Sequence, residues 1–247
     1  MQIICSFLIL PFALHDTYLL YLRPELLLEG VALGVVNALA TLSLYKGFEV
    51  GHLSIVSPIA SSYPVVSVFL AIIFLGESLT GERLLGITLV IVGIILVSIQ
   101  KQQQELRKRV TEGVVYAIIY MVLGGVLFFG LKPVSQVLGV YLPVLLLRWT
   151  SACILAAVFL AWKPKGAIRL NAFSFIAVIA ILDTFANVAY NVGVSYGTVS
   201  IVSTVGGLFS PVTVLLAWIC LKERLTTHQI IGFLAVAAGV TVLGLFG

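Results

Sequence analysis

The chain has 247 residues and a formal net charge of +4, with 61% hydrophobic and only 10% charged residues. Soluble globular domains carry about 25% charged residues because their surface faces water, so a chain this poor in charge indicates a protein whose main solvent is lipid. Its basic residues lie in short segments between apolar runs, without a basic helix or an aromatic-basic platform, which argues against a nucleic-acid-binding protein.

Long apolar runs divide the chain from end to end. A helix needs about 20 apolar residues to cross a bilayer, and eight runs come close to this length: 30–49, 53–76, 83–100, 113–133, 141–162, 172–195, 198–221 and 228–246. The run at 1–14 is shorter and lacks the basic start and cleavage site of a signal peptide. We therefore expect it to be the end of a transmembrane helix.

An internal repeat relates the two halves at an offset of 146 positions. Residues 51–93 and 197–239 share 17 identities over 43 ungapped positions. The shared Ser-Ile-Val-Ser and Glu-x-Leu-Thr segments are partly polar, so apolar bias does not explain them. The offset predicts two repeats, 1–100 and 111–247, joined by a basic linker at 101–110. It also predicts that the first repeat lacks one helix and the start of the next, through a late gene start or a truncated product.

Each repeat has a Ser-rich helix with an internal proline, then Glu-x-Leu-Thr, then a helix with two glycines seven residues apart. This pattern, at Glu77 to Thr80 and again at 223–226, resembles the EamA-type domain of the drug/metabolite transporter superfamily. The resemblance implies ten helices in two inverted five-helix repeats, a central cavity, and transport of small metabolites such as amino acids. We therefore expect an all-α integral membrane protein with about eight full transmembrane helices and a partial N-terminal helix.

The distribution of lysine and arginine predicts the orientation in the membrane. An odd number of helices in each repeat inverts the second copy relative to the first. One side then holds ten basic residues and the other holds Arg23, Arg83 and Lys132. Basic loops favour the cytoplasm, so we expect a multi-pass plasma-membrane protein whose C-terminal Gly247 lies outside the cell.

The sharpest polar signal is a carboxylate within the span at 172–195. Asp183, Asn187 and Asn191 follow at helical spacing, with Tyr190 adjacent, and form one stripe on the helix. A charge at the centre of a span costs roughly 3 kcal/mol on insertion scales, so the stripe should face the bundle interior. The repeat offset places three residues of the first copy at equivalent positions: Asn37, Thr41 and Tyr45.

Two interpretations of these stripes stay open. They fit opposite walls of a substrate or proton site, in which Asp183 binds a substrate amine or a coupling proton. Alternatively, the amides join helices across a tight interface. Arg148 has three open roles: its long side chain reaches the membrane interface, it pairs with Asp183, or it holds a substrate carboxylate.

Prolines inside the predicted helices point to a second set of candidate residues. Pro58, Pro64 and Pro211 each remove a backbone hydrogen bond, which a membrane helix tolerates where it faces protein or water. We expect an unwound segment that lines the cavity, with Ser61 and Tyr63 as substrate contacts, and kinks that serve packing alone are the alternative.

The repeated glutamates and glycines have simpler expected roles. Glu77 and Glu223 end their helices, where a capping or loop-pinning role, with Thr80 or Thr226 capping the next helix, is the main interpretation and gating is the alternative. Gly86, Gly93, Gly232 and Gly239 are expected to allow close helix packing.

The pattern as a whole predicts a secondary transporter of small polar metabolites, amino-acid-like or drug-like, that works by alternating access without a cofactor or a metal. A non-transporting membrane scaffold or a degenerate fragment is the alternative. The G-x-S-x-G match at Gly193 to Gly197 follows a helix and lacks a nearby base and acid, so we expect no enzyme. The expected partners are a small-molecule substrate and the lipid bilayer, and assembly as a homodimer is left open.

Overall fold

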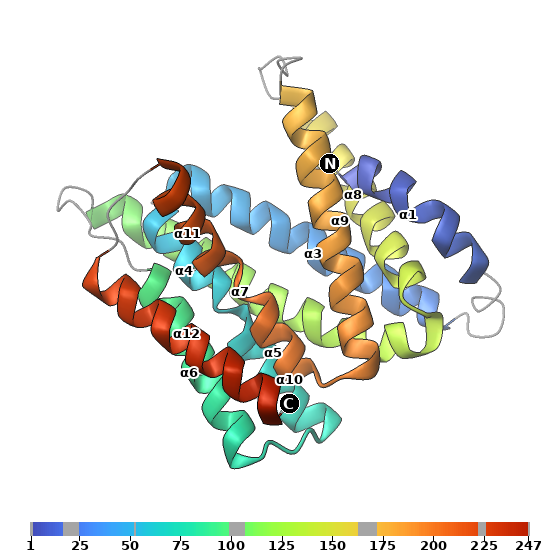
Figure 1. Ribbon diagram of the computed structural model, residues 1–247. Coiled ribbons are helices and arrows are strands. Elements are labelled where there is room, and N and C mark those ends of the chain that lie inside the picture. Colours follow the sequence, from blue (N-terminus) through green and yellow to red (C-terminus); the bar gives the residue numbers. More distant parts are fainter. Residues whose placement is uncertain are drawn as a thin grey trace. The chain divides into compact units, whose positions relative to one another are not determined.

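The computed structural model describes residues 2–16, 25–51, 53–98, 107–162, 172–221 and 226–246. Every regular element in these ranges is an α-helix, as the sequence predicts (Figure 1). In chain order the helices are α1 (Gln2–Asp16), α3 (Glu25–Val50), α4 (Leu53–Ser61), α5 (Tyr63–Leu75), α6 (Gly81–Ser98), α7 (Arg107–Leu138), α8 (Tyr141–Trp162), α9 (Ala172–Tyr196), α10 (Val199–Gly206), α11 (Phe209–Leu221) and α12 (Thr227–Phe246).

Six helical stretches in the described residues are long and apolar enough to cross a membrane. They lie within α3, α7, α8, α9, α12 and the α10–α11 segment. This number is smaller than the eight spans expected from hydropathy. The expected span at 53–76 is divided between α4 and α5, and its apolar helical part, Ile59–Leu75, is shorter than a full span. The expected span at 83–100 runs past Ser98, so its end lies outside the described residues.

The chain divides into two compact units. Unit 1 contains Met1–Ala38 and Gly130–Tyr196, and unit 2 contains Leu39–Phe129 and Gly197–Gly247. Each unit therefore combines segments from both halves of the sequence. The helix α7 begins at Arg107, so residues 107–110 of the expected linker are helical, while 101–106 lie outside the described residues.

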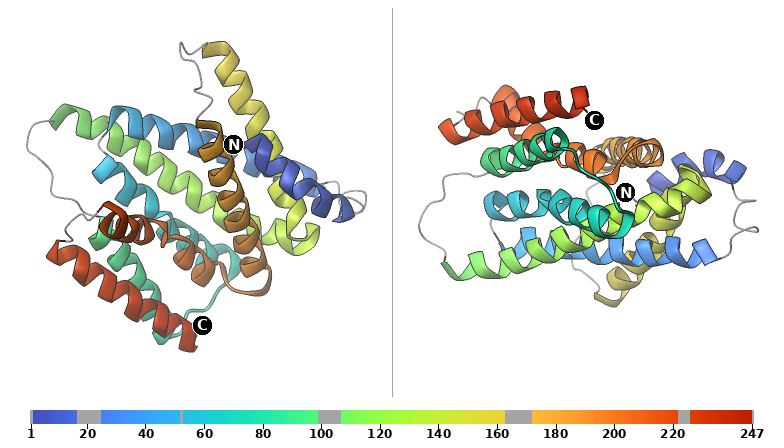
Figure 2. Two further views of the ribbon diagram at one scale, coloured as in Figure 1. Left: turned by 45° about the horizontal axis from the view of Figure 1, so that its top comes forward. Right: turned by 90° about the horizontal axis from the view of Figure 1, so that it is seen from below.

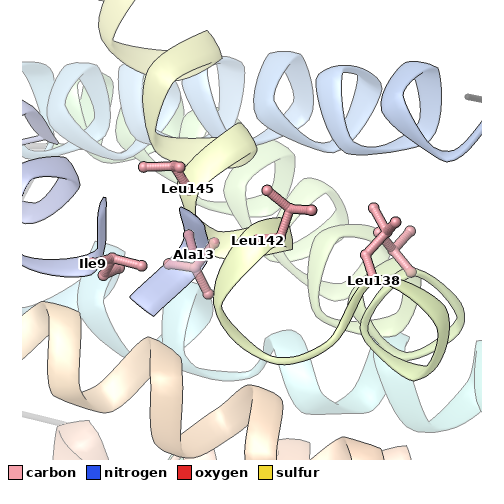
Figure 3. Packing of buried hydrophobic residues seen from close by; sticks show 7 residues of the cluster. Ile9, Ala13, Leu138, Leu142 and Leu145 are labelled. Carbon is pink, nitrogen blue, oxygen red and sulfur yellow. The ribbon is translucent and has the colours of Figure 1, made fainter. Parts of the chain in front are cut away.

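In unit 1, α1 packs against α8 and α9. A buried apolar cluster joins α1 to the end of α7 and the start of α8, where Ile9 and Ala13 lie beside Leu138, Leu142 and Leu145 (Figure 3). Because lipid tails are as apolar as leucine, such contacts stabilise a membrane bundle through close van der Waals packing. The same packing positions the first turns of α8 beside α1.

Small residues bring α3 close to α8 in the same unit. A Cβ atom added at Gly34 would lie 2.4 Å from Cβ of Thr150, and one added at Gly30 would lie 2.8 Å from Cδ1 of Leu146. These distances leave no room for a side chain on that face of α3. Small residues at helix contacts are typical of membrane bundles because they let the backbones approach.

In unit 2, α6 and α12 lie side by side (Figures 1 and 2). A Cβ at Gly93 would lie 2.7 Å from the carbonyl oxygen of Gly232, and a Cβ at Gly239 would lie 2.7 Å from that of Gly86. The prediction that the repeated glycines allow close helix packing is confirmed.

Two of the expected spans are interrupted rather than continuous. α4 ends at Ser61 and α5 begins at Tyr63, with Pro64 in its first turn, where the missing N–H of proline costs little. α10 ends at Gly206 and α11 begins at Phe209. The expected interruption of the runs 53–76 and 198–221 is therefore present, and the expectation that these breaks line a cavity stays a prediction. The side chain of Pro58 lies outside the described residues.

The carboxylate of Glu77 caps α10 from the loop after α5. Its oxygens accept hydrogen bonds from the N–H groups of Val199 (2.8 Å) and Ser200 (3.1 Å) and from the Ser200 hydroxyl (2.6 Å). A negative group at this position satisfies the first N–H groups of a helix and complements its dipole. Of the two interpretations offered, capping is the one the contacts support, and Glu223 lies outside the described residues.

Thr80 caps the helix that follows it, as predicted, whereas at Thr226 the contacts show a glutamine side chain that reaches back to the residue before α12. The Thr80 hydroxyl accepts a hydrogen bond of 3.4 Å from the N–H of Arg83 at the start of α6. Before α12, the N–H of Thr226 donates to the side-chain oxygen of Gln229 at 2.9 Å, and the Thr226 hydroxyl donates to the same oxygen at 2.9 Å. The glutamine that reaches back to the capping residue is one half of a capping box.

Candidate functional site

The strongest polar feature of unit 1 is an ion pair between α8 and α9. Nη2 of Arg148 lies 2.5 Å from Oδ2 of Asp183. Nη1 of Arg148 also donates a hydrogen bond of 2.7 Å to the side-chain oxygen of Gln2 on α1. Arg148 is only 3% exposed, so its charge is balanced within the protein. A buried charge without a partner would be strongly destabilising.

Asp183 is the accessible member of this pair. Its side chain is 33% exposed, against 4% for the side chain of Arg148. One turn later, the Asn187 amide donates to the backbone oxygen of Asp183 at 2.8 Å and lies 3.4 Å from its Oδ1. The Asp183 side chain and the Asn187 amide therefore lie nearer the surface of unit 1 than the guanidinium does.

These contacts bear on two of the three roles offered for Arg148. Its burial excludes a side chain that extends to the membrane interface, and its distance to Asp183 shows the ion pair. The predicted proximity of Asp183 and Asn187 is also confirmed. Their binding of a substrate stays a prediction.

Asn191 and Tyr190 lie deeper in the same helix. Asn191 is fully buried, and its amide donates a hydrogen bond of 3.0 Å to the carbonyl of Val140 in the turn between α7 and α8. Tyr190 is 7% exposed. For Asn191, the contact supports the alternative in which an amide joins two neighbouring segments of the bundle by a hydrogen bond.

Asn37 on α3 makes a similar contact with α8. Its amide donates a hydrogen bond of 2.7 Å to the Ser151 hydroxyl, which in turn donates to the Gly34 carbonyl at 3.0 Å. Ser151 follows Arg148 by one turn of α8. Asn37 and Asp183, which the repeat offset places at equivalent positions, therefore both contact the same short segment of α8.

The remaining predicted site residues belong to unit 2 and are described apart from the ion pair. Thr41 is half-buried, whereas Tyr45 near the end of α3 is 58% exposed, contrary to the expected inward stripe. An exposed tyrosine at a helix end suits the membrane–water interface, where its ring and hydroxyl meet both environments. Ser61 and Tyr63 are buried, and the Tyr63 ring stacks on Phe128 with centroids 4.6 Å apart.

Sequence reasoning missed two residues of the ion-pair site. Gln2 holds the guanidinium and Ser151 holds Asn37, yet neither was a candidate. A signal for Gln2 was present, because Gln2 and Arg148 differ by the repeat offset of 146 positions. Ser151 had no comparable signal.

The described residues contain no group of three or more His, Cys, Asp or Glu side chains that could hold a metal ion. Unit 1 also has an apolar cavity of about 360 Å³ between α1 and α8. None of its lining residues is charged: Ser6, Phe7, Leu10, Trp149, Ala152, Cys153 and Ala156. The charged groups that could bind a polar solute in unit 1 therefore lie at the ion pair and do not line this cavity.

Comparison with known proteins shows the family of this chain. A solved crystal structure of another protein matches 99% of this chain and 95% of its own, with a TM-score of 0.69 and 14% identity, which shows a shared fold. An uncharacterized protein of Methanocaldococcus jannaschii is 36% identical over 75 residues, and the match spans 30% of this chain and 55% of that relative. The model of the EamA-like transporter family matches residues 1–99 and 111–245. The chain is a multi-pass membrane protein that belongs to the EamA-like transporter family.

Proposed function

We propose that the chain is a secondary transporter that moves small polar solutes across the plasma membrane by alternating access. The observation that carries this proposal is the ion pair between Arg148 and Asp183, set within two apolar helices. The remaining proposed contacts are Asn187 and Tyr190 on α9, with Asn37 and Asn191 in supporting positions.

The energetics of the pair favour a functional role over a purely structural one. Each charge costs about 2.5–3.5 kcal/mol at the centre of a membrane helix. Replacing a buried pair by apolar residues is often neutral or stabilising, so packing alone does not call for Arg148 and Asp183. The Asp183 side chain is one-third exposed, whereas its Oδ2 and the facing Nη2 of Arg148 are buried, so the proposal requires the pair to open when a solute binds.

The mechanism we propose uses two inverted repeats, 1–100 and 111–247. Several observations support it: the family model matches the chain twice, and α4 and α10 begin 146 positions apart, as do α6 and α12. The breaks at Ser62 and Leu208 share this offset. In unit 2, Gly93 meets Gly232 and Gly86 meets Gly239 reciprocally, as a two-fold relation requires. Inverted repeats give alternating access when one bundle rocks against the other.

A flux assay tests the proposal. The full chain is purified, reconstituted into liposomes, and offered a panel of radiolabelled amino acids, carboxylates and amines. We expect saturable flux of at least one solute, and loss of that flux in Arg148→Gln. Glu49→Gln is the matched control, because it breaks the exposed ion pair between Lys46 and Glu49. Flux no greater than that of empty liposomes for every solute would contradict transport and favour the scaffold alternative.

A further inference from the structure

The guanidinium of Arg148 has a hydrogen-bond donor without a partner among the described residues. Nη1 donates to Gln2 and Nη2 faces Oδ2 of Asp183, but Nε has no hydrogen-bond partner among the described residues. Nε and Nη2 form one edge of the guanidinium, the edge that binds both oxygens of a carboxylate in a two-pronged pair. Asp183 is within ion-pair distance of one nitrogen of this edge.

Asp183 pairs with Arg148 through one oxygen only. Its Oδ1 has a 3.4 Å contact with the Asn187 amide, close to the limit of a hydrogen bond, and its side chain is one-third exposed. A carboxylate that used both Nε and Nη2 would gain a second charge-assisted hydrogen bond. The site therefore favours exchange of Asp183 for a carboxylate that can take both positions.

We infer that Arg148 binds the carboxylate group of the transported solute in place of Asp183, and that the displaced Asp183 then takes either the ammonium group of the same solute or a proton. This inference rests on the proposed transport function, for which it names the solute class and the coupling.

The charges of the exchange balance in both cases. Before binding, the guanidinium and the carboxylate of the protein cancel. A solute with a carboxylate alone pairs with Arg148, and Asp183 takes one proton from the buffered solution, which keeps the net charge of the site at zero. A zwitterionic solute brings its own ammonium to Asp183, so no proton is needed. The loaded site is neutral either way.

A solute that carries only an amine does not satisfy this site. Its ammonium would draw Asp183 away and leave the guanidinium, which is 3% exposed, beside a second cation and without a counter-charge. The ion pair thus argues against Asp183 as the sole anchor for an amine, which was one role considered from the sequence.

Other ionisable groups on the neighbouring helices are few. α9 carries Tyr190 and Tyr196 besides Asp183, and α8 carries Tyr141 and Cys153 besides Arg148. α1 carries Cys5, with His15 and Asp16 at its far end. The unit 1 parts of α3 and α7 carry Glu25, Glu29 and Lys132. Asp183 is the group within ion-pair distance of Arg148, so the proton is assigned to it.

A matched set of three probes tests the inference on the full chain in lipid nanodiscs. 4-Hydroxybutyrate has a carboxylate alone, 4-aminobutyrate has both charges, and 4-amino-1-butanol has an amine alone. Titration calorimetry at pH 7 in two buffers of different ionisation enthalpy gives the affinity and the protons taken up for each probe. We expect one proton with 4-hydroxybutyrate, none with 4-aminobutyrate, and about tenfold or more weaker binding of the amine.

Two variants test which side chain binds the carboxylate and which one takes the proton. Asp183→Asn removes the competing carboxylate and the group that takes the proton, so it should bind 4-hydroxybutyrate at least as tightly as the wild type and without proton uptake. Arg148→Lys keeps the charge but loses the two-pronged edge, so it should bind both carboxylates about tenfold more weakly while it stays folded. Glu49→Gln should match the wild type throughout.

Three results would overturn the inference: no binding of either carboxylate, unchanged proton uptake in Asp183→Asn, or preference for the amine. Each concerns binding in nanodiscs and is independent of flux. If carboxylates bind as expected but no solute crosses the liposome membrane, the transport proposal fails instead.

Discussion

The side-chain oxygen of Gln2 accepts a hydrogen bond of 2.7 Å from Nη1 of Arg148, and the two residues lie 146 positions apart, which is the offset of the internal repeat. The two-fold relation proposed for the repeats would bring equivalent positions together near its axis. The charged residue that we assign to the solute is therefore held by the residue at the equivalent position of the sequence repeat. This relation joins the repeat seen in the sequence to the chemistry of the candidate site.

Removing that hydrogen bond should weaken unit 1. In Gln2→Leu, Nη1 of Arg148 loses its acceptor while it stays buried, so we expect a loss of about 1–3 kcal/mol in the free energy of unfolding. Gln2→Glu should be better tolerated, since it restores an acceptor next to the guanidinium. Unfolding of the purified chain in mild detergent measures both. Equal stability of Gln2→Leu and the wild type would show that this contact contributes nothing.

The two charges should depend on each other. Arg148→Met leaves Asp183 without a counter-charge, and Asp183→Leu leaves the more deeply buried Arg148 alone, so we expect each to cost about 2–4 kcal/mol, with the larger cost for Asp183→Leu. The double variant removes the pair and should return to within about 1 kcal/mol of the wild type. Thermal unfolding of all four proteins checks this. Additive losses would mean that the residues do not interact.

The contact between α6 and α12 should be sensitive to a single methyl group. A Cβ at Gly239 would lie 2.7 Å from the backbone oxygen of Gly86 and 2.8 Å from the backbone nitrogen of Val90, so the helices must separate. We expect Gly239→Ala to cost about 1–3 kcal/mol in the free energy of unfolding.

Gly244, on the same helix, provides the control. A Cβ there meets nothing within 4 Å, and alanine is the better helix former by about 1 kcal/mol. Gly244→Ala should therefore leave stability unchanged or raise it slightly. If both alanine variants unfold at the same temperature, the close approach of α6 and α12 is not the feature that limits this position.

The cap on α10 should depend on the charge of Glu77. Its carboxylate accepts three hydrogen bonds from Val199 and Ser200. Glu77→Gln loses the charge and one acceptor oxygen, so we expect a cost of about 1–2 kcal/mol. Glu82→Gln is the matched control, because Glu82 is exposed in the first turn of α6. Amide hydrogen exchange at Val199 and Ser200 should rise in Glu77→Gln and stay unchanged in Glu82→Gln.

Hydropathy predicted the long helices well. The expected spans 141–162 and 172–195 correspond to Tyr141–Trp162 and Ala172–Tyr196. Hydropathy alone did not predict the breaks near Ser62 and Leu208. Apolar residues continue across both breaks, and a hydropathy average over a long window does not change at a local turn. Pro64 marked the first break, but its exact effect depends on how α4 and α5 end and begin.

The candidate site was predicted in part. Helical spacing placed Asn187 beside Asp183, since residues four apart share a face of a helix. The pairing of Asp183 with Arg148 was one of three open roles, because spacing within one helix says nothing about which turn of another helix it meets. Tyr45 was predicted to face the bundle interior but is exposed. It lies near the end of α3, where a residue on the same helical stripe no longer faces a neighbouring helix.

The most direct measurement is the flux of the transported solute in liposomes that contain the double variant Arg148→Met/Asp183→Leu. This variant keeps the apolar environment and is expected to be as stable as the wild type, so a loss of activity would not reflect unfolding. We predict flux at the level of empty liposomes, because the groups that bind the solute are gone. Flux at the wild-type rate would contradict the assignment of the ion pair as the solute site.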